Sequence, residues 1–201
     1  MKLSIKTILM ILIIPVSINA EEISYDYIDS NIWSHKLSGG GGTDSTTYDG
    51  YRILINKTVT KNIHFLAAYI DSDKKNGDAY INKSIGFGIN YPINKKTDLV
   101  FKYFHQKYNF KYIARTDSDG IFNAIESKII HQLSDDIELT FGLMRNDMAG
   151  SKILYQGYSA GAKYKINDNF SLRFRIHNLK DSKIASTADL STTEMGLSYS
   201  F

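Results

Sequence analysis

The 201-residue chain contains no cysteine, and this absence removes two classes of secreted protein. A lipoprotein needs a cysteine at the start of its mature chain, and a small disulfide-stapled domain needs several. Proline is almost as rare, since only Pro15 and Pro92 occur. Because proline cannot donate a backbone hydrogen bond, a chain with so little of it has few interruptions to a β-ladder.

A strong net charge and long apolar runs are also missing. The chain has 24 Lys and Arg against 21 Asp and Glu, and two of the lysines lie in its first 20 residues, so 22 basic residues remain after them. This balance argues against a nucleic-acid-binding protein. Beyond residue 20 no run of 18 apolar residues occurs, so the sequence predicts no membrane-spanning helix.

The N-terminus has the layout of a cleavable secretory signal. Two lysines precede an apolar run over residues 8–16, and Ala20 is followed by two glutamates. A membrane anchor is the competing interpretation, but the run is shorter than the about 20 apolar residues that an anchor needs. We therefore expect cleavage after Ala20, which divides the chain into a signal peptide, residues 1–20, and one domain, residues 21–201.

The C-terminal segment, residues 195–201, alternates larger apolar or aromatic residues with small ones and ends on Phe201. Such alternation is typical of a strand with one lipid-facing side. The segment resembles the closing strand of bacterial outer-membrane β-barrel proteins, which ends on an aromatic residue with another aromatic two positions earlier. The resemblance implies that Leu197, Tyr199 and Phe201 form a signal for the barrel-assembly machinery. An edge strand of a soluble β-sandwich is the alternative that this segment alone leaves open.

Short turn clusters recur at a regular spacing, with longer polar stretches between them. The turn clusters lie at 60–62, 94–97, 134–136 and 167–169, and the longer stretches at 38–47, 71–78, 110–119, 147–152 and 180–189. Short turns at one end and longer loops at the other are typical of outer-membrane barrels, whose short turns face the periplasm and whose loops face outside. Four turns and five loops require ten strands.

We therefore predict an all-β fold, a closed antiparallel transmembrane β-barrel. The predicted strands are 22–33, 49–59, 63–72, 80–91, 98–109, 120–132, 137–146, 154–165, 170–179 and 190–201. The last strand is expected to pair with residues 23–27, because lipid leaves no open sheet edge. An eight-stranded barrel is the alternative if the weakly patterned region 120–146 has been misread.

Alternate positions of these strands form outward rows without charge, as lipid requires, since Arg or Lys at mid-bilayer costs about 2–4 kcal/mol. Lys57 is the one base that extends such a row, near a short turn. Aromatic residues gather at both ends of the rows and predict two interfacial girdles. The girdle residues are Tyr91, Tyr164, Phe170, Tyr199 and Phe201 at the turns, and Tyr51, Tyr69, Tyr103 and Tyr158 toward the loops.

The opposite, inward rows carry the charge. The predicted lumen network consists of Arg52, Lys102, Glu126, Lys128, Glu138, Lys163, Lys165, Arg173, Arg175 and Glu194, with His64 and Asp26 on the same side. Seven bases against three acids indicate a mildly basic lumen. Because small barrels have interiors that side chains just fill, we expect a filled lumen. In it Arg173 and Arg175 pair with Glu194, and Glu126 offsets Lys128. A narrow, anion-preferring passage is the alternative.

Catalytic, cofactor and metal sites are not expected. Outer-membrane barrels include lipid A-modifying enzymes, and His177 stands near Asn178, Asp181 and Ser182. However, the barrel deacylases separate His and Ser by one residue and continue with Asn, whereas His177 is followed by Asn-Leu-Lys. We therefore interpret His177 as an interior or rim residue. The glycines at 39–42 lack the Lys-Ser or Lys-Thr that closes a phosphate loop, and the acidic turns at 71–73 and 117–119 lack calcium-loop spacing.

These observations predict a structural or porin-like protein of the Gram-negative cell outer membrane, without enzymatic activity. A surface adhesion or interaction protein acting through its extracellular loops is the first alternative, and a lipid A-modifying enzyme is the second. The expected partners are outer-membrane lipid and lipopolysaccharide, with the barrel-assembly machinery and periplasmic chaperones during biogenesis. No nucleic-acid partner and no cofactor are expected, and the barrel is expected to be a monomer.

Overall fold

The computed structural model describes residues 23–38, 45–75, 77–113, 116–150, 154–181 and 189–201. These residues form ten antiparallel strands, each paired with its sequence neighbours, and β1 also pairs with β10 to close the barrel. The strands are β1 (Tyr27–Ser38), β2 (Ser45–Thr60), β3 (Ile63–Asp73), β4 (Ala79–Asn94), β5 (Thr97–Lys111), β6 (Ser118–Gln132), β7 (Ile137–Met148), β8 (Leu154–Lys165), β9 (Phe170–Asp181) and β10 (Asp189–Ser200). The predicted ten-stranded barrel is confirmed, and the eight-stranded alternative is wrong.

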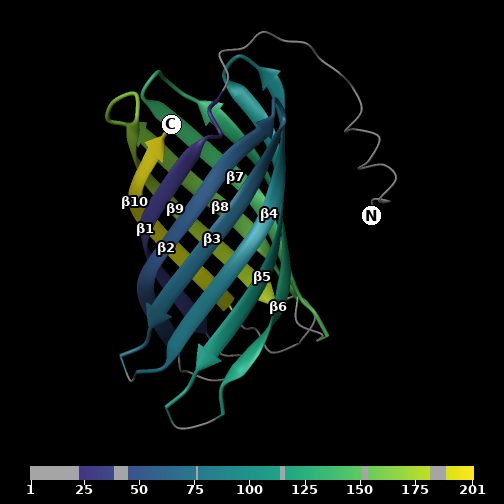
Figure 1. The fold of residues 1–201 in the computed structure, drawn as a ribbon, viewed down its shortest axis with the longest axis vertical. Helices are drawn as coiled ribbons and strands as arrows, with labels where there is room; N and C mark the ends of the chain where they lie inside the picture. Colours follow the sequence, from purple (N-terminus) through teal and green to yellow (C-terminus); the bar gives the residue numbers. More distant parts are fainter. Residues whose placement is uncertain (1–22, 39–44, 76, 114–115, 151–153, 182–188) are drawn as a thin grey trace.

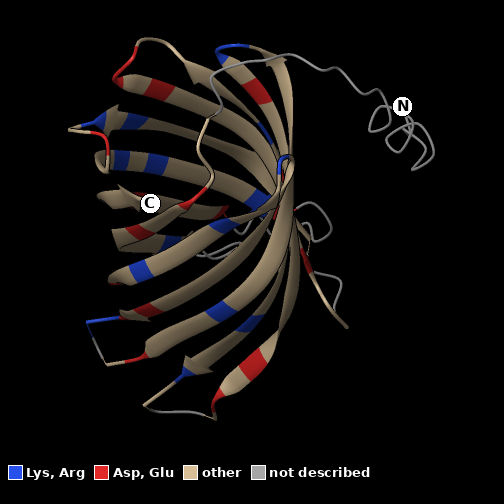
Figure 2. Cartoon of the chain, turned by 45° about the horizontal axis from the view of Figure 1, so that its top comes forward, with Lys and Arg blue, Asp and Glu red and all other residues tan. Residues whose placement is uncertain are grey.

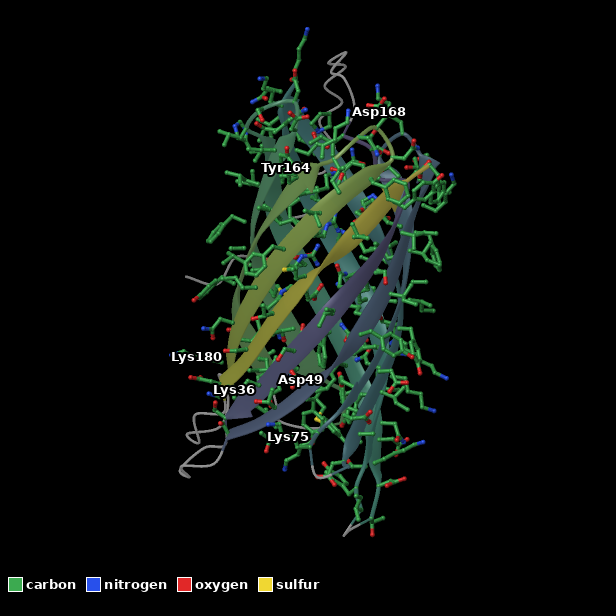
Figure 3. All side chains as sticks on the ribbon, turned by 90° about the vertical axis from the view of Figure 1, so that its left-hand side faces the viewer. Lys36, Asp49, Lys75, Tyr164, Asp168 and Lys180 are labelled. Carbon is green, nitrogen blue, oxygen red and sulfur yellow. The ribbon has the colours of Figure 1, made fainter. Side chains whose placement is uncertain are left out.

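The two ends of the barrel differ in their connections. Figure 1 shows the tilted strands with the start of β1 and the C-terminus at one end. The short connections after β2, β4, β6 and β8 lie at this same end, which we call the turn end. The opposite end is the loop end. Figure 3 labels Tyr164 and Asp168 at the turn end, and Lys36, Asp49, Lys75 and Lys180 toward the loop end.

Nine predicted strands lie within four residues of the observed bounds, whereas the first is displaced by five residues. Residues 23–26 leave the sheet and fold across the turn end, because the Tyr25 ring is buried in the lumen there. The closing ladder accordingly begins with Tyr27 opposite Ser200, and Phe201 N–H donates to the Asp26 carbonyl over 3.3 Å. The expected pairing of β10 with residues 23–27 is thus correct only at its C-terminal edge.

The distribution of side chains is inverted relative to that of a soluble protein. Large apolar side chains of the alternating rows face outward, as Ile55, Phe141 and Leu197 do with 41%, 59% and 48% exposure. Charged positions occur along the strands as well as at both ends (Figure 2), yet most of the mid-strand ones are buried inside. An apolar exterior around a polar interior is the arrangement of a barrel in lipid. Within the described ranges no helix is long and apolar enough to span a bilayer.

The outward aromatics also cluster as expected for girdles. At the turn end the Phe170 and Tyr199 rings lie 5.1 Å apart and the Tyr199 and Phe201 rings 6.3 Å apart, and at the loop end Tyr51 and Tyr69 lie 6.2 Å apart. The expected signal peptide, residues 1–20, and the glycines at 39–42 lie outside the described residues. Their interpretation therefore stays a prediction.

Candidate functional site

The lumen is the candidate functional site because it gathers most of the buried polar side chains. Of the ten residues predicted to form its charge network, seven are buried inside the barrel: Arg52, Lys102, Glu126, Lys128, Arg173, Arg175 and Glu194. Glu138 and Lys163 are partly buried and pair at 2.9 Å. Lys165 instead lies at the rim, where its side chain is 41% exposed and pairs with Asp168 of the adjacent turn at 2.7 Å.

The ion pairs differ from those expected. Arg173 pairs with Asp29 and not with Glu194. Glu194 is held by Arg52 at 2.6 Å and by His177 at 3.2 Å. The expected offset of Lys128 by Glu126 is present, with Nζ and Oε2 3.7 Å apart. Arg173 found a different partner because β1 brings Asp29 into the lumen, which the displaced prediction of that strand did not anticipate.

The parity of β1 was the source of this error. Because alternate residues of a strand face opposite sides, a displaced prediction can send the wrong row inward. Asp26 was expected inside but lies at the outer rim of the turn end, where its carboxylate accepts from Lys57 Nζ at 3.0 Å. Asp29 lies inside with no exposed surface. Ile28 and Ile32 are exposed on the outside of β1. Two isoleucines four residues apart lie on the same side of a strand, so this pair is the feature of the sequence that indicates the observed parity.

With the observed parity the lumen is close to neutral. Between the two rims the buried or partly buried bases of the lumen are Arg52, Lys102, Lys128, Lys163, Arg173 and Arg175, and the corresponding acids are Asp29, Asp98, Glu126, Glu138 and Glu194. One excess positive charge therefore replaces the four expected from the sequence. Asp29 and Asp98 account for most of the difference.

The turn half of the lumen, between the charged residues and the turn end, is filled. The Tyr25 ring stacks on His64 with their centroids 4.7 Å apart, and the Tyr25 hydroxyl donates to Asp98 at 2.7 Å. Val100 and Ile130 pack against the same ring. The cavity that remains there measures about 20 Å³, which is room for one water molecule.

Gly88 makes room for this packing. A Cβ at residue 88 would lie 1.9 Å from His64 Nε2 and 2.5 Å from its Cε1, so only glycine lets the imidazole lie flat against β4. His64 is itself only 1% exposed. The stack of Tyr25 on His64 therefore depends on the absence of a side chain at Gly88.

The loop half of the lumen is different, because it encloses a cavity of about 310 Å³ that we call the vestibule. Its walls include aromatic side chains of six strands, Trp33, His35, Tyr48, Tyr80, Tyr108, Phe110, Phe122 and Tyr155, together with Tyr112 just after β5. Trp33 stacks on His35 at 4.8 Å and on Tyr80 at 5.6 Å between ring centroids. Its floor carries the polar side chains of Arg52, Lys102, Glu126, Arg175, His177 and Glu194.

Sequence reasoning missed the vestibule, although the signal was present. Tyr48, Tyr80, Tyr108 and Tyr155 have the inward parity of their strands and lie toward the loop end. Aromatic residues were considered only in the outward rows, where they predict girdles. An aromatic that is inward and close to a loop indicates the wall of a cavity instead.

The features considered for catalysis do not converge. His177 lies in the lumen against Glu194, whereas Asn178 points to the other face of β9 and donates to the Tyr158 hydroxyl at 3.5 Å. Ser182 lies outside the described residues. Among the residues that the structure describes, no group of three His, Cys, Asp or Glu side chains could hold a metal ion.

Solved structures similar to this fold include an outer membrane channel, a porin and an autotransporter translocator domain. An outer membrane channel from Pseudomonas putida F1 is 8% identical with a TM-score of 0.49, and covers 94% of this chain and 100% of its own. The translocator domain of the autotransporter NalP from Neisseria meningitidis is 10% identical with a TM-score of 0.48, covering 90% of each chain. Neisserial surface protein A is 12% identical with a TM-score of 0.46, covering 90% of this chain and all of its own. No protein-family model and no curated protein matches the chain.

Proposed function

We propose that the protein is a porin-like barrel of the cell outer membrane whose lumen is closed at its turn end by its own side chains. The observation that carries this proposal is the filled turn half of the lumen. Tyr25 fills the turn end between His64 and Asp98, and the Arg173–Asp29 pair spans β10 on the lumen wall, from β9 to β1. A wide water-filled channel for solutes has no continuous path through such packing.

The exterior supports residence in a membrane. Exposed side chains of the outward rows are mainly apolar through the middle of the strands, with His105 as an exception. The exposed bases Lys57, Lys83, Lys107 and Arg145 lie toward strand ends. There their stems can reach the headgroup region. Outer-membrane lipid and lipopolysaccharide are therefore the proposed surroundings of this face, around a monomeric barrel.

Conductance in a planar bilayer tests the closed lumen. The purified mature protein is expected to give no steady, large unitary currents. Tyr25→Ala removes the ring that fills the turn end, so this variant is expected to pass small ions. Tyr164→Ala is the matched control, because Tyr164 lies at the same end but is 53% exposed on the outer face. Large steady currents from the unaltered protein would overturn the proposal.

The C-terminal strand is the proposed assembly signal, read at Leu197, Tyr199 and Phe201 by the barrel-assembly machinery after delivery by periplasmic chaperones. Phe201 also joins the closing seam, since Lys57 Nζ lies 4.7 Å from the centre of its ring. Phe201→Asp is expected to impair outer-membrane assembly more than Ile121→Asp in β6. Normal surface levels and unchanged heat-modifiable migration of the Phe201 variant would contradict this role.

Absence of enzymatic activity stays part of the proposal. His177 is bonded to Glu194 inside the lumen and does not face lipid. An unchanged lipid A profile after deletion of the gene is the expected result. A change in lipid A acylation that His177→Ala reproduces would establish an enzyme instead.

A further inference from the structure

The vestibule combines two features that the proposed function does not use. Its walls are aromatic, and two of the bases on its floor have no hydrogen-bond or ion-pair partner among the residues that the structure describes. We propose that the vestibule binds a small amphipathic organic anion, a ring-bearing carboxylate, with its ring between the aromatic walls and its carboxylate against Lys102 and Arg175. Binding does not require the barrel to conduct, so this site and the closed lumen can fail independently.

The walls favour a flat apolar body. Trp33, His35 and Tyr80 present nearly parallel rings, with interplanar angles of 6° and 11° from Trp33 to the other two. Across the cavity Tyr108 and Phe122 lie 4.9 Å apart. Ring faces and edges together accept an aromatic or flat aliphatic ring. A cavity of about 310 Å³ falls in the size range of small-molecule sites.

The floor favours an anion. Lys102 lies opposite Glu126 in the ladder, but Glu126 is bonded to Lys128 at 3.7 Å and to Ser159 at 3.2 Å. Lys102 is only 4% exposed, and within the described part of the chain its ammonium makes no hydrogen bond or ion pair. A buried charge without a partner is unfavourable, so a ligand carboxylate that bonds Lys102 stabilises the site.

Arg175 repeats this arrangement on the other side of the floor. It lies opposite Glu194, which is bonded to Arg52 at 2.6 Å and to His177 at 3.2 Å. Arg175 is 7% exposed, and among the described residues its guanidinium also has no hydrogen bond or ion pair. Three bases, Arg52, Lys102 and Arg175, thus accompany two acids at the floor. This excess of positive charge disfavours a cation and leaves two donors for one carboxylate.

Several of the other polar groups of the lining are already paired, which does not suit a neutral sugar. The Asn82 amide donates to the Tyr80 hydroxyl at 2.9 Å and to Gln106 at 3.1 Å, and His35 bonds Thr192 at 2.8 Å. A sugar needs several partners for its hydroxyls, and these groups already bond one another. An inorganic anion would satisfy the floor but leave the aromatic walls without contacts. The ring-bearing carboxylate uses both.

Trp33 supplies a reporter for the experiment, because it is the only tryptophan of the chain and stands in the vestibule wall. The purified barrel in detergent is titrated with 4-nitrobenzoate, whose nitro ring quenches indole fluorescence. Saturable quenching is expected, and the neutral 4-nitrobenzyl alcohol is expected to bind about tenfold more weakly or worse. Linear quenching without saturation, or equal binding of the two compounds, would overturn the proposal. This comparison of ligands needs no variant.

Two variants locate the carboxylate. Lys102→Met and Arg175→Met are each expected to weaken 4-nitrobenzoate binding about tenfold, the cost of one charge-assisted hydrogen bond, while leaving binding of the alcohol unchanged. Lys83→Met is the matched control, since Lys83 is exposed on the outside of β4. It is expected to bind as the unaltered barrel does. Retained affinity in both lumen variants, with heat-modifiable migration showing that they are folded, would contradict the proposed floor.

Discussion

The turn half of the lumen leaves a cavity of about 20 Å³, whereas the vestibule encloses about 310 Å³, although the same strands wall both. In the turn half the chain before β1 folds into the lumen, where Tyr25 reaches His64 of β3 and Asp98 of β5. In the vestibule the rings of the strands stack on one another around the cavity, as Trp33 of β1 does on Tyr80 of β4.

Diameter alone does not decide whether a small barrel is filled. A barrel of ten strands has one width, set by strand number and stagger. What varies along its axis is whether chain from outside the sheet enters the lumen. Tyr25, which precedes β1, fills the turn half, whereas the vestibule is lined mainly by side chains of the strands themselves.

Arg173 and Arg175 allow the sharpest test of this comparison, because both face inward from β9 with 8% and 7% exposure. Arg173→Met leaves the Asp29 carboxylate buried without its base. The free energy of unfolding is expected to fall by about 3–5 kcal/mol. Arg175→Met leaves no acid without a base, since Glu194 keeps Arg52 and His177. Its expected loss in the free energy of unfolding is therefore less than about 1 kcal/mol. Urea unfolding of both variants in the same lipid measures the difference. Equal losses would show that the two halves are not distinct.

Gly88 tests the packing of the turn half with a smaller expected effect. A methyl group at residue 88 displaces His64 and with it the stacked Tyr25 ring, so Gly88→Ala is expected to destabilise the barrel by about 1–3 kcal/mol. His64→Ala in the same chain removes the clash. The double variant should therefore lose less stability than the two single losses added together. Strict additivity would show that His64 and Gly88 do not interact as described.

The sequence was sufficient for the barrel because alternation and turn spacing are local signals. Nine strands and the parity of the inward charges from Arg52 to Glu194 follow from them. The first strand was displaced because Ile23, Tyr25 and Tyr27 alternate as an outward row would. Nothing local shows that the chain before Tyr27 leaves the sheet to bury Tyr25 against Asp98, 73 residues away.

The candidate site was less accessible to sequence reasoning for a physical reason. The two ion pairs that sequence reasoning missed join next-but-one strands, β9 to β1 and β2 to β10, so they depend on closure and stagger of the whole barrel. Arg173 and Asp29 are 144 residues apart, and the sequence favours Glu194 on the neighbouring strand instead. The vestibule was missed because a cavity is defined by space that side chains leave, which no single row of residues records.

The closing seam at the turn end, where Asp26 contacts Lys57 and Thr58, gives the smallest expected effect on stability, and that effect depends on pH. Partial burial raises the pKa of Asp26, but the hydrogen bonds from Thr58 N–H and Lys57 outweigh it, so the pKa lies below its ordinary value of 3.8. The folded barrel thus favours the carboxylate, and this stabilisation is present above pH 3.8 and lost as the pH falls through the lower, folded-state value.

Asp26→Asn removes the charge and is expected to cost about 1 kcal/mol at pH 7, since one charge-assisted bond to an exposed lysine is weakened. The difference between the two proteins should shrink as the pH is lowered below 3.8, because the native carboxyl then becomes neutral as well. Asp135→Asn, in an exposed turn at the same end, is the control. A gap that stays constant down to low pH would show that the charge of Asp26 does not hold the seam, and that the turn end is closed by the Tyr25 packing alone.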